Sequence, residues 1–200
     1  MKNFDGLLHK GMTALQAGRL RDAERCFRQA VELSPRHFGA LNLLTVALTG
    51  LERFEEAEAF AERALRIDAS SDATHYNYGT VLKHNNKLEQ AIAAFDAALA
   101  INPRHVKALN NRGAAYSQLE RYEEALADFD RALALDRRYG DAYYNKANAL
   151  AGLKCKMLPM HDDFALRGEF IIGHNAFESV LCVLNRKSHH AIILPDAQVK

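Results

Sequence analysis

The sequence predicts an all-α fold in which pairs of helices stack one after another. Two sets of alanines repeat with a period of 34 residues, and apolar residues recur between them at the spacing of a helix face. A unit of this length is one helix-turn-helix pair that cannot bury its apolar face alone, so neighbouring pairs must cover that face. The alanines are Ala23, Ala57, Ala91 and Ala125, each followed seven residues later by Ala30, Ala64, Ala98 and Ala132.

The first helix of each unit has a small residue at one place. When Phe4 is counted as position 1, position 8 is small in five successive units. We expect two helices to approach closely there, because a bulky side chain would push them apart. These residues are Gly11, Thr45, Gly79, Gly113 and Ala147.

The second helix of each unit supplies an apolar stripe. Positions 24 and 30 are both predicted to lie on this stripe, so that the units together form a continuous core. Position 24 is Phe27, Ala61, Phe95 and Phe129, and position 30 is Leu33, Ile67, Ile101 and Leu135.

The same register predicts the helix ends. Position 32 is Pro35 in the first unit and Pro103 in the third, where the second helix should end sharply, whereas Ala69 and Arg137 predict less sharp ends in the other two. First helices are expected near residues 5–17, 37–50, 72–84, 106–118 and 140–153, and second helices near 20–33, 54–67, 88–101 and 122–135.

The pattern breaks in the fifth unit. Pro159 stands where earlier units have alanine, and a proline inside that helix would cost about 3 kcal/mol or more. We therefore predict a solenoid over residues 4–153, divided into repeats 4–37, 38–71, 72–105 and 106–139 and a half repeat 140–153. Residues 154–200 form a divergent, irregular tail that is a cap or is poorly ordered.

Three interpretations of this tail stay open. Its apolar runs could cover the open end of the stack as a cap, since solenoids need terminal cover. They could form a small hairpin, because Val180 to Leu184 and Ala191 to Leu194 are short apolar runs with polar residues between them. The third interpretation is a truncated or frame-altered relative of a longer repeat protein, because the break falls in the middle of a unit.

The combination of a small residue at position 8, alanine at 20 and 27, an aromatic at 24 and proline at 32 resembles the tetratricopeptide repeat (TPR). The resemblance covers residues 4 to about 153. It implies a TPR right-handed superhelical solenoid of antiparallel helix pairs. In this family the first helices line the concave surface, and positions 2, 5, 6, 9, 12 and 13 point into the groove.

Position 6 provides the candidate binding residues. Asn77, Asn111 and Asn145, here called the asparagine row, are expected to follow one another along the groove. An amide offers a donor and an acceptor, so the row suits the backbone of an extended peptide. The alternative is that these amides satisfy backbone groups of a neighbouring unit. Polar and aromatic residues at positions 5 and 9 complete the candidate protein-binding set: Tyr76, Asn110, Tyr144, Thr80 and Asn148.

One binding mode of the family is not supported by these residues. Chaperone-binding members hold a partner's C-terminal carboxylate with lysines and an arginine at set positions. Units three to five place Asp141 and Asn145 where the last two cations would stand, and Lys107 alone does not replace them. A carboxylate clamp needs positive charge, so we exclude that clamp.

The asparagine row is also similar to the repeat region of O-linked N-acetylglucosamine transferase-like proteins. The likeness extends to the run from Ala108 to Gly113. Such transferases carry a large catalytic domain after the repeats, whereas too few residues follow position 153 for one. The alternative function is therefore the substrate-recognition portion of a protein glycosyltransferase, truncated before its catalytic domain.

Composition argues against several other classes. The chain has 26 basic and 25 acidic residues that alternate along it, so no nucleic-acid partner is expected. Without a secretory signal or a long apolar run, the chain is expected to be cytoplasmic, with no membrane partner. We expect no cofactor, no metal site and no catalytic residue, because the ligand types in the tail lack the spacing of a known site: His161, Asp162, Asp163, His174, Cys182, His189 and His190.

The sequence as a whole thus predicts a non-catalytic scaffold for protein–protein interaction. Its partner would be a protein or peptide whose extended segment lies in the concave TPR groove. Self-association through the face of the unit-five helix is a further prediction.

Overall fold

A computed structural model describes residues 3–157, 171–173, 180–184 and 191–194 of this chain. Within these ranges the chain forms helices and three short strands. The helices are α1 (Phe4–Gln16), α2 (Leu20–Leu33), α3 (Phe38–Gly50), α4 (Phe54–Ile67), α5 (Asp72–His84), α6 (Leu88–Ile101), α7 (Val106–Gln118), α8 (Tyr122–Leu135) and α9 (Gly140–Met157). The strands are β1 (Ile171–Gly173), β2 (Val180–Leu184) and β3 (Ala191–Leu194).

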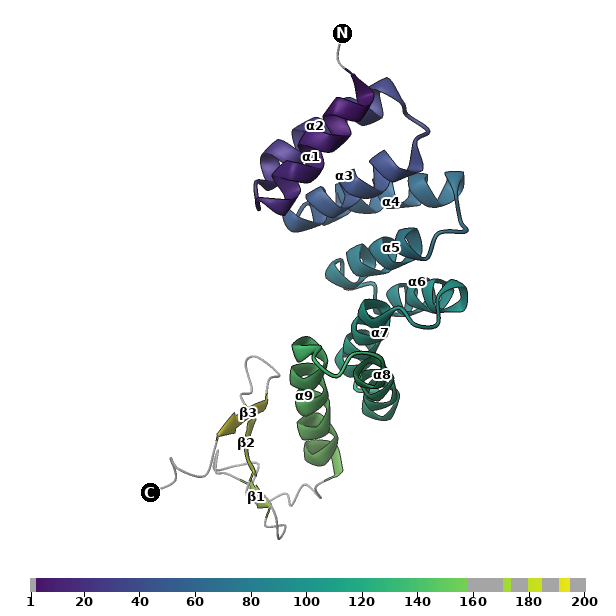
Figure 1. Ribbon diagram of the computed structural model, residues 1–200. Coiled ribbons are helices and arrows are strands. Elements are labelled where there is room, and N and C mark those ends of the chain that lie inside the picture. Colours follow the sequence, from purple (N-terminus) through teal and green to yellow (C-terminus); the bar gives the residue numbers. More distant parts are fainter. Residues whose placement is uncertain (1–2, 158–170, 174–179, 185–190, 195–200) are drawn as a thin grey trace.

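The helices form a curved stack of antiparallel pairs, as the sequence predicts (Figure 1). Each helix packs mainly against the helices before and after it in the chain. Each odd-numbered helix also contacts the next odd-numbered helix, whereas the even-numbered helices of the described part make no comparable contacts with one another. The odd-numbered helices therefore lie on the inner side of the curve.

In units one, three and four, the close approach of the paired helices at position 8 depends on a phenylalanine ring at position 24. A Cβ atom added to Gly11, Gly79 or Gly113 would overlap the phenylalanine ring at position 24 of the same unit, and in units three and four the nearest ring atom would lie 2.7 Å away. Unit two has the reverse arrangement, with the larger Thr45 at position 8 and Ala61 at position 24, and both residues are buried. The two positions thus share one fixed space between paired helices.

The turn inside each complete unit has a left-handed residue at position 15. Its φ is 71° at Gly18, 59° at Glu52, 59° at Asn86 and 56° at Glu120. Left-handed backbone costs a residue with a Cβ about 1–2 kcal/mol, and the packing of the two helices compensates for this cost. Unit five has no such turn, because α9 continues through Lys154 at this position and ends at Met157, four residues beyond the predicted end.

The second helices of units one to four all end at position 30, so the prediction of less sharp ends in units two and four is wrong. The reason is the residue at position 31. Asp68, Asn102 and Asp136 each accept a hydrogen bond through Oδ1 from the backbone N–H two residues later, at 2.8 to 3.1 Å. This side-chain turn ends the helix whether or not proline follows.

The prediction for position 30 also needs correction. Position 24 is fully buried, but Leu33 and Ile101 at position 30 are 51% and 45% exposed, and Ile67 and Leu135 are half-buried. Position 30 is the last residue of the helix, where the next unit no longer covers the side chain. The alanines of the 34-residue repeat are fully buried as expected.

Ion pairs join neighbouring helices across the stack. Arg112 of α7 donates to both oxygens of Asp128 of α8, at 2.7 and 2.6 Å, and also pairs with Asp96 of α6. Burial lowers the pKa of Arg112, but hydrogen bonds to these two carboxylates outweigh burial and raise it above its usual range. Asp128 is buried, so this bidentate pair keeps its charge compensated.

The strands of the tail form an antiparallel sheet in the order β1-β2-β3. In the hairpin of β2 and β3, Leu181 is opposite Leu194 and Leu184 is opposite Ala191. This is the pairing that the hairpin interpretation predicts from the two apolar runs. Strand β3 also contacts α9, so the sheet lies beside the last helix of the stack (Figure 1).

The close approach at position 8 can be tested in unit three. We expect Gly79→Ala to reduce the free energy of unfolding by about 2 kcal/mol, because the new methyl group overlaps the Phe95 ring. Chemical denaturation followed by circular dichroism measures this change. Gly140→Ala is the control, since a Cβ there would meet no atom within 4 Å.

The same substitution should cost less when Phe95 is already alanine. A double-mutant cycle of Gly79→Ala and Phe95→Ala therefore should show a coupling energy of at least about 1 kcal/mol. Additive effects would contradict the shared space that the structure describes.

Candidate functional site

The asparagine row lies at the junctions between successive first helices. Asn77 is on α5, Asn111 on α7 and Asn145 on α9, and all three side chains are half-buried. Each occupies the same position of its unit, and Asn111 and Asn145 contact side chains on the first helix of the preceding unit. The structure thereby brings these residues to the inner side of the stack, where the odd-numbered helices meet.

Asn111 is the centre of a polar cluster between α5 and α7. Its Nδ2 lies 3.4 Å from the Tyr76 hydroxyl oxygen and 3.4 Å from Thr80 Oγ1, and its Oδ1 lies 3.4 Å from Lys83 Nζ. These distances exceed the usual range of about 2.7–3.2 Å for an N–H···O hydrogen bond, so the contacts are weak. The amide of Asn111 is therefore held in place without being tightly bound.

The position of Tyr76 is fixed from the other side by the start of α7. His105 caps this helix, since its Nδ1 accepts a hydrogen bond from the Ala108 N–H at 3.2 Å. Its ring stacks on Tyr76 with 4.8 Å between centroids. Burial raises the pKa of Tyr76, whose hydroxyl also interacts with the side chains of Thr80 and Asn111.

Asn145 makes a stronger contact between α7 and α9. Its Nδ2 donates a 3.0 Å hydrogen bond to Oδ1 of Asn110. Asn110 is only 4% exposed, so this predicted binding residue lies beneath the inner surface and positions Asn145. The Oδ1 atom of Asn145 accepts no hydrogen bond in the described part of the chain.

The remaining predicted residues are more accessible. Asn77 makes no side-chain hydrogen bond with the described residues and is half-buried. Tyr144 and Asn148 are exposed on α9. Thr80 donates its hydroxyl to the Tyr76 backbone carbonyl at 2.9 Å, which leaves its oxygen as an acceptor. The row therefore contains one amide without a side-chain hydrogen bond to the described residues and two that are linked to the preceding unit.

Lys83 is an inner-surface residue that the sequence analysis did not single out. It lies at position 12 of unit three, one of the groove positions of the family, and its side chain is half-buried. Burial lowers the pKa of its ammonium group. The signal in the sequence is its place at position 12, which belongs to the same set of groove positions as positions 5, 6 and 9.

Two further polar groups at inner positions lack partners among the described residues. Oδ1 of Asn42 on α3 and Oγ of Ser117 on α7 are buried without a hydrogen bond. Asn42 donates its Nδ2 to Thr74 Oγ1 at 2.6 Å, so only its acceptor is unused. Buried groups of this kind normally find a partner, and both stand at groove positions of their units.

The groove changes character along its length. In units one and two the inner positions mix polar side chains such as Asn42 with apolar ones, of which Met12 of α1 and Val46 of α3 are exposed. In units three to five the inner positions hold amides, hydroxyls and Lys83. The inner surface is thus partly apolar at one end and mainly polar at the other.

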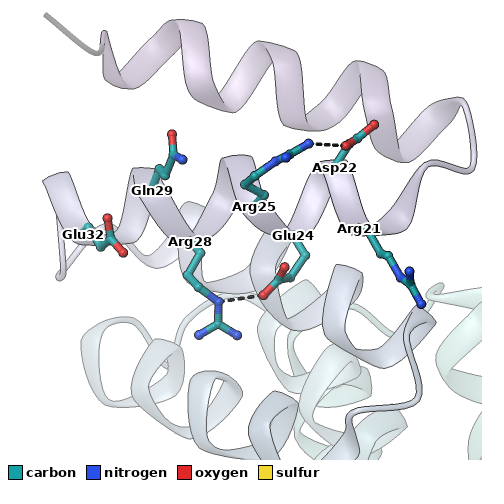
Figure 2. Close-up of a pocket in the computed structure, with 7 residues that line it drawn as sticks. All are labelled: Arg21, Asp22, Glu24, Arg25, Arg28, Gln29 and Glu32. Atoms are coloured by element: carbon teal, nitrogen blue, oxygen red, sulfur yellow. Dashed lines mark hydrogen bonds and ion pairs between the residues drawn. The ribbon is translucent and has the colours of Figure 1, made fainter.

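The outer side of the stack has a different character in unit one. Figure 2 shows a hollow lined by seven residues that all belong to α2: Arg21, Asp22, Glu24, Arg25, Arg28, Gln29 and Glu32. Arg28 donates to Glu24 at 2.6 Å, and Arg25 pairs with Asp22. Because one helix supplies every lining residue and two of its arginines pair with its own carboxylates, this is an open helix surface.

The structure describes neither a metal site nor a membrane span in the ranges given above. Those ranges contain no group of three or more His, Cys, Asp or Glu side chains that could hold a metal ion. No helix among the described residues is long and apolar enough to cross a membrane. The tail residues considered for metal binding at positions 161–163, 174, 189 and 190 lie outside the described residues, as does the side chain at position 182.

Serial helix pairs, a fixed period and an inner surface made by the first helices define an α-solenoid repeat protein. Three family models agree with this class. Two described as "Tetratricopeptide repeat" match residues 8–72 and 106–139, and one described as "TPR repeat" matches residues 79–120. Together they match more than half of the chain, which belongs to the tetratricopeptide-repeat family.

Solved structures share this fold at low sequence identity. PilF of Pseudomonas aeruginosa is 23% identical, with a TM-score of 0.68 over 76% of this chain and 69% of that one. A thermophilic TPR protein of Thermus thermophilus is 23% identical, with a TM-score of 0.66 over 74% and 82%. YrrB, described as a TPR protein with an unusual peptide-binding site, is 23% identical, with a TM-score of 0.62 over 68% and 71%.

No curated protein matches the chain. The narrower likeness to O-linked N-acetylglucosamine transferases stays a prediction from the sequence.

The burial of Lys83 has a measurable consequence for stability. We expect Lys83→Met to raise the free energy of unfolding at neutral pH by about 1 kcal/mol, because it removes a charge that is desolvated without a carboxylate partner among the described residues. Since the folded-state pKa is lowered, the folded protein loses this proton before the unfolded chain does. The free energy of unfolding of the wild type should therefore rise as the pH approaches about 10.4, which is the pKa of lysine in the unfolded chain. The difference in this free energy between the wild type and Lys83→Met should narrow over the same pH range.

Denaturant titrations of both proteins from neutral pH to about the unfolded pKa would measure this difference. Lys107→Met is the control, since Lys107 is an exposed lysine of the same inner surface. A constant difference across this pH range would contradict the burial of a charged ammonium at Lys83.

Proposed function

We propose that this chain is a non-catalytic scaffold that binds an extended segment of a partner protein along the inner surface of its odd-numbered helices. TPR proteins generally mediate protein–protein interactions, and YrrB is one solved relative in fold with a peptide-binding site in its description. The observation that carries the proposal is the state of the asparagine row in the described part of the chain. There Asn77 makes no side-chain hydrogen bond, Asn145 has an unused acceptor, and Asn111 is held only by long contacts.

These amides suit a peptide backbone better than a particular side chain. A backbone presents N–H and C=O groups at regular intervals, and an amide side chain can pair with both. First helices of neighbouring units lie about 10 Å apart, which corresponds to about three residues of an extended chain. One asparagine per unit could therefore contact every third residue of the guest segment.

Binding can be measured without knowing the partner. Fluorescently labelled full-length chain would be applied to a bead library of random peptides of about 12 residues, enough to span three or four units. Selected peptides would then be synthesised for titration. We expect Asn77→Ala to raise Kd about fivefold, since a lost hydrogen bond contributes about 1 kcal/mol. It should leave stability unchanged, because Asn77 bonds no other described side chain.

The triple variant Asn77→Ala, Asn111→Ala and Asn145→Ala should weaken binding by a larger factor. Its matched control replaces three side chains of the second helices, on the outer side, with alanine: Gln29, Gln90 and Glu123. The absence of any selected peptide would overturn the proposed function. Equal affinity of the triple variant and the control would show that the asparagine row is structural.

A second observation favours self-association through α9. In unit two, the residues at positions 4 and 11 of the first helix, Leu41 and Leu48, are fully buried. The corresponding residues of α9 are Tyr143 and Leu150, which are 54% and 39% exposed. We propose that a second copy of the chain covers this apolar stripe.

Light scattering over a range of concentrations tests this proposal. We expect a mass above that of one chain at high concentration, and Leu150→Glu should return it to that of one chain, because a charge cannot be buried in an apolar contact. Leu33→Glu is the control, since Leu33 is an exposed leucine on the helix of another unit. A single-chain mass at every concentration would rule out this interface.

A further inference from the structure

Three arginines line a hollow between the first two units, here called the arginine hollow. It has a volume of ≈ 440 Å³ and is lined by Pro35, Arg36, Arg63, Arg66 and Ile67. The first two residues belong to the connection between α2 and α3, and the other three belong to the last part of α4. Because α4 is a second helix, the arginine hollow lies apart from the groove that the first helices form.

Two of these arginines are exposed and keep most of their charge uncompensated. Arg36 makes no hydrogen bond, ion pair or ring contact with any described residue. Arg66 approaches Glu62 only to 3.8 Å, and the two side chains are 67% and 44% exposed. An ion pair of this length in water contributes little, so it does not hold Arg66 away from a ligand.

Arg63 is positioned by contacts that leave its charge without a carboxylate in the described part of the chain. Its Nη2 donates to the Pro35 carbonyl oxygen at 3.4 Å, and its guanidinium carbon lies 5.3 Å from the centre of the Phe60 ring. A guanidinium group has five N–H donors, and the hydrogen bond to Pro35 uses one of them. Arg63 is half-buried and partly ordered, so it loses less freedom when it binds a ligand.

The arginine hollow concentrates positive charge. No acidic residue lines it, and all three guanidinium groups stay charged at physiological pH. Other arginines of the second helices have a carboxylate close by, as Arg25 has Asp22 and Arg121 has Glu124. Like charges repel, so an anion that enters the hollow would remove an unfavourable interaction of the free chain.

The repeat does not require arginines at these places. Arg36 is at position 33 of unit one, and Arg63 and Arg66 are at positions 26 and 29 of unit two. Between units three and four the same positions include two arginines, of which Arg131 pairs with Asp128 at 3.7 Å. Between units two and three all the corresponding residues are small and uncharged: Ser70, Ala97 and Ala100.

A phosphate monoester suits three arginines better than a carboxylate does. It has three terminal oxygens and a charge of about −1.5 to −2 at pH 7, whereas a carboxylate has two oxygens and one charge. Each guanidinium group can donate to a phosphate oxygen, and its planar fork matches phosphate geometry. Pro35 and Ile67 add apolar surface for the residues beside the phosphate.

We propose that Arg36, Arg63 and Arg66 bind a phosphorylated serine or threonine of a partner protein. A phosphorylated segment fits better than a nucleic acid or a membrane, because those ligands need an extended basic surface. This chain has a net charge of +1, and its positive charge is concentrated in one hollow. The proposal does not depend on the groove, since no groove residue takes part.

Three versions of a bead library test the arginine hollow with the full-length chain. Random peptides carry phosphoserine at the central position in one version, serine in the second and glutamate in the third. We expect the phosphoserine version to give most of the binders. Selected peptides should bind at least about tenfold more tightly than the same peptides with serine or glutamate, because only the phosphate offers three oxygens and a double charge.

A triple variant then tests the three arginines. Each substitution introduces a residue that another unit has at the same position, so the variant should fold, which circular dichroism checks: Arg36→Ser as at Ser70, Arg63→Gln as at Gln29 and Arg66→Ala as at Ala100. It should raise the Kd of selected phosphopeptides at least about thirtyfold, since it removes several hydrogen bonds between charged groups.

The matched control removes the same charge from arginines that have carboxylate partners: Arg25→Gln, Arg121→Gln and Arg131→Gln. It should bind phosphopeptides as tightly as the wild type. The groove variant with alanine at Asn77, Asn111 and Asn145 should do the same, because the phosphate binds outside the groove.

Several results would overturn the phosphate site. They are the absence of binders in the phosphoserine version, equal affinity for phosphoserine and serine peptides, and equal affinity of the arginine variant and its control. Loss of phosphopeptide binding in the groove variant would place the phosphate in the groove instead. Tighter binding of phosphoinositide vesicles or of a short DNA duplex to the same three arginines would overturn the peptide as the ligand.

Discussion

The architecture depends on the close approach of the two helices in each unit. A ring at position 24 fills the space that a small residue at position 8 leaves open, and unit two keeps the same space with the sizes reversed. Since interiors are packed as densely as organic crystals, this contact sets the distance between paired helices. Repetition of one distance in successive units makes the stack regular and gives its inner surface a regular spacing.

The inner surface uses that regularity for polar contacts between units. Position 6 of one unit meets positions 5, 9 and 12 of the unit before it, as Asn111 meets Tyr76, Thr80 and Lys83. Where the preceding unit offers a buried amide, as at Asn110, the contact is short and firm. The asparagine at position 6 thus has a different number of unused hydrogen-bonding atoms in each unit. The side chains of the preceding unit determine how many of these atoms remain for a bound peptide.

Much of this fold can be predicted from the sequence because a period constrains every unit at once. The second helices begin and end at the predicted residues, and the fully buried phenylalanines and alanines were identified from their register. Features that do not repeat with the 34-residue period could not be predicted in this way. The length of α9 depends on the loss of a left-handed turn at Lys154, and the helix ends in units two and four depend on side-chain turns at Asp68 and Asp136. The register places Lys83 at a groove position, but its half-burial without a carboxylate nearby is a property of its surroundings in three dimensions.

The buried side chains fall into two main clusters that meet within α5. Val81 belongs to the cluster of the first units and the adjacent Leu82 to that of the later units. In repeat proteins such divisions allow one part to open while the rest stays folded. The partly apolar and the mainly polar parts of the groove lie on either side of this division, so a guest that spans both would link two parts of the solenoid that can otherwise open separately. A partner bound along the groove would then make it harder for either part of the solenoid to unfold on its own.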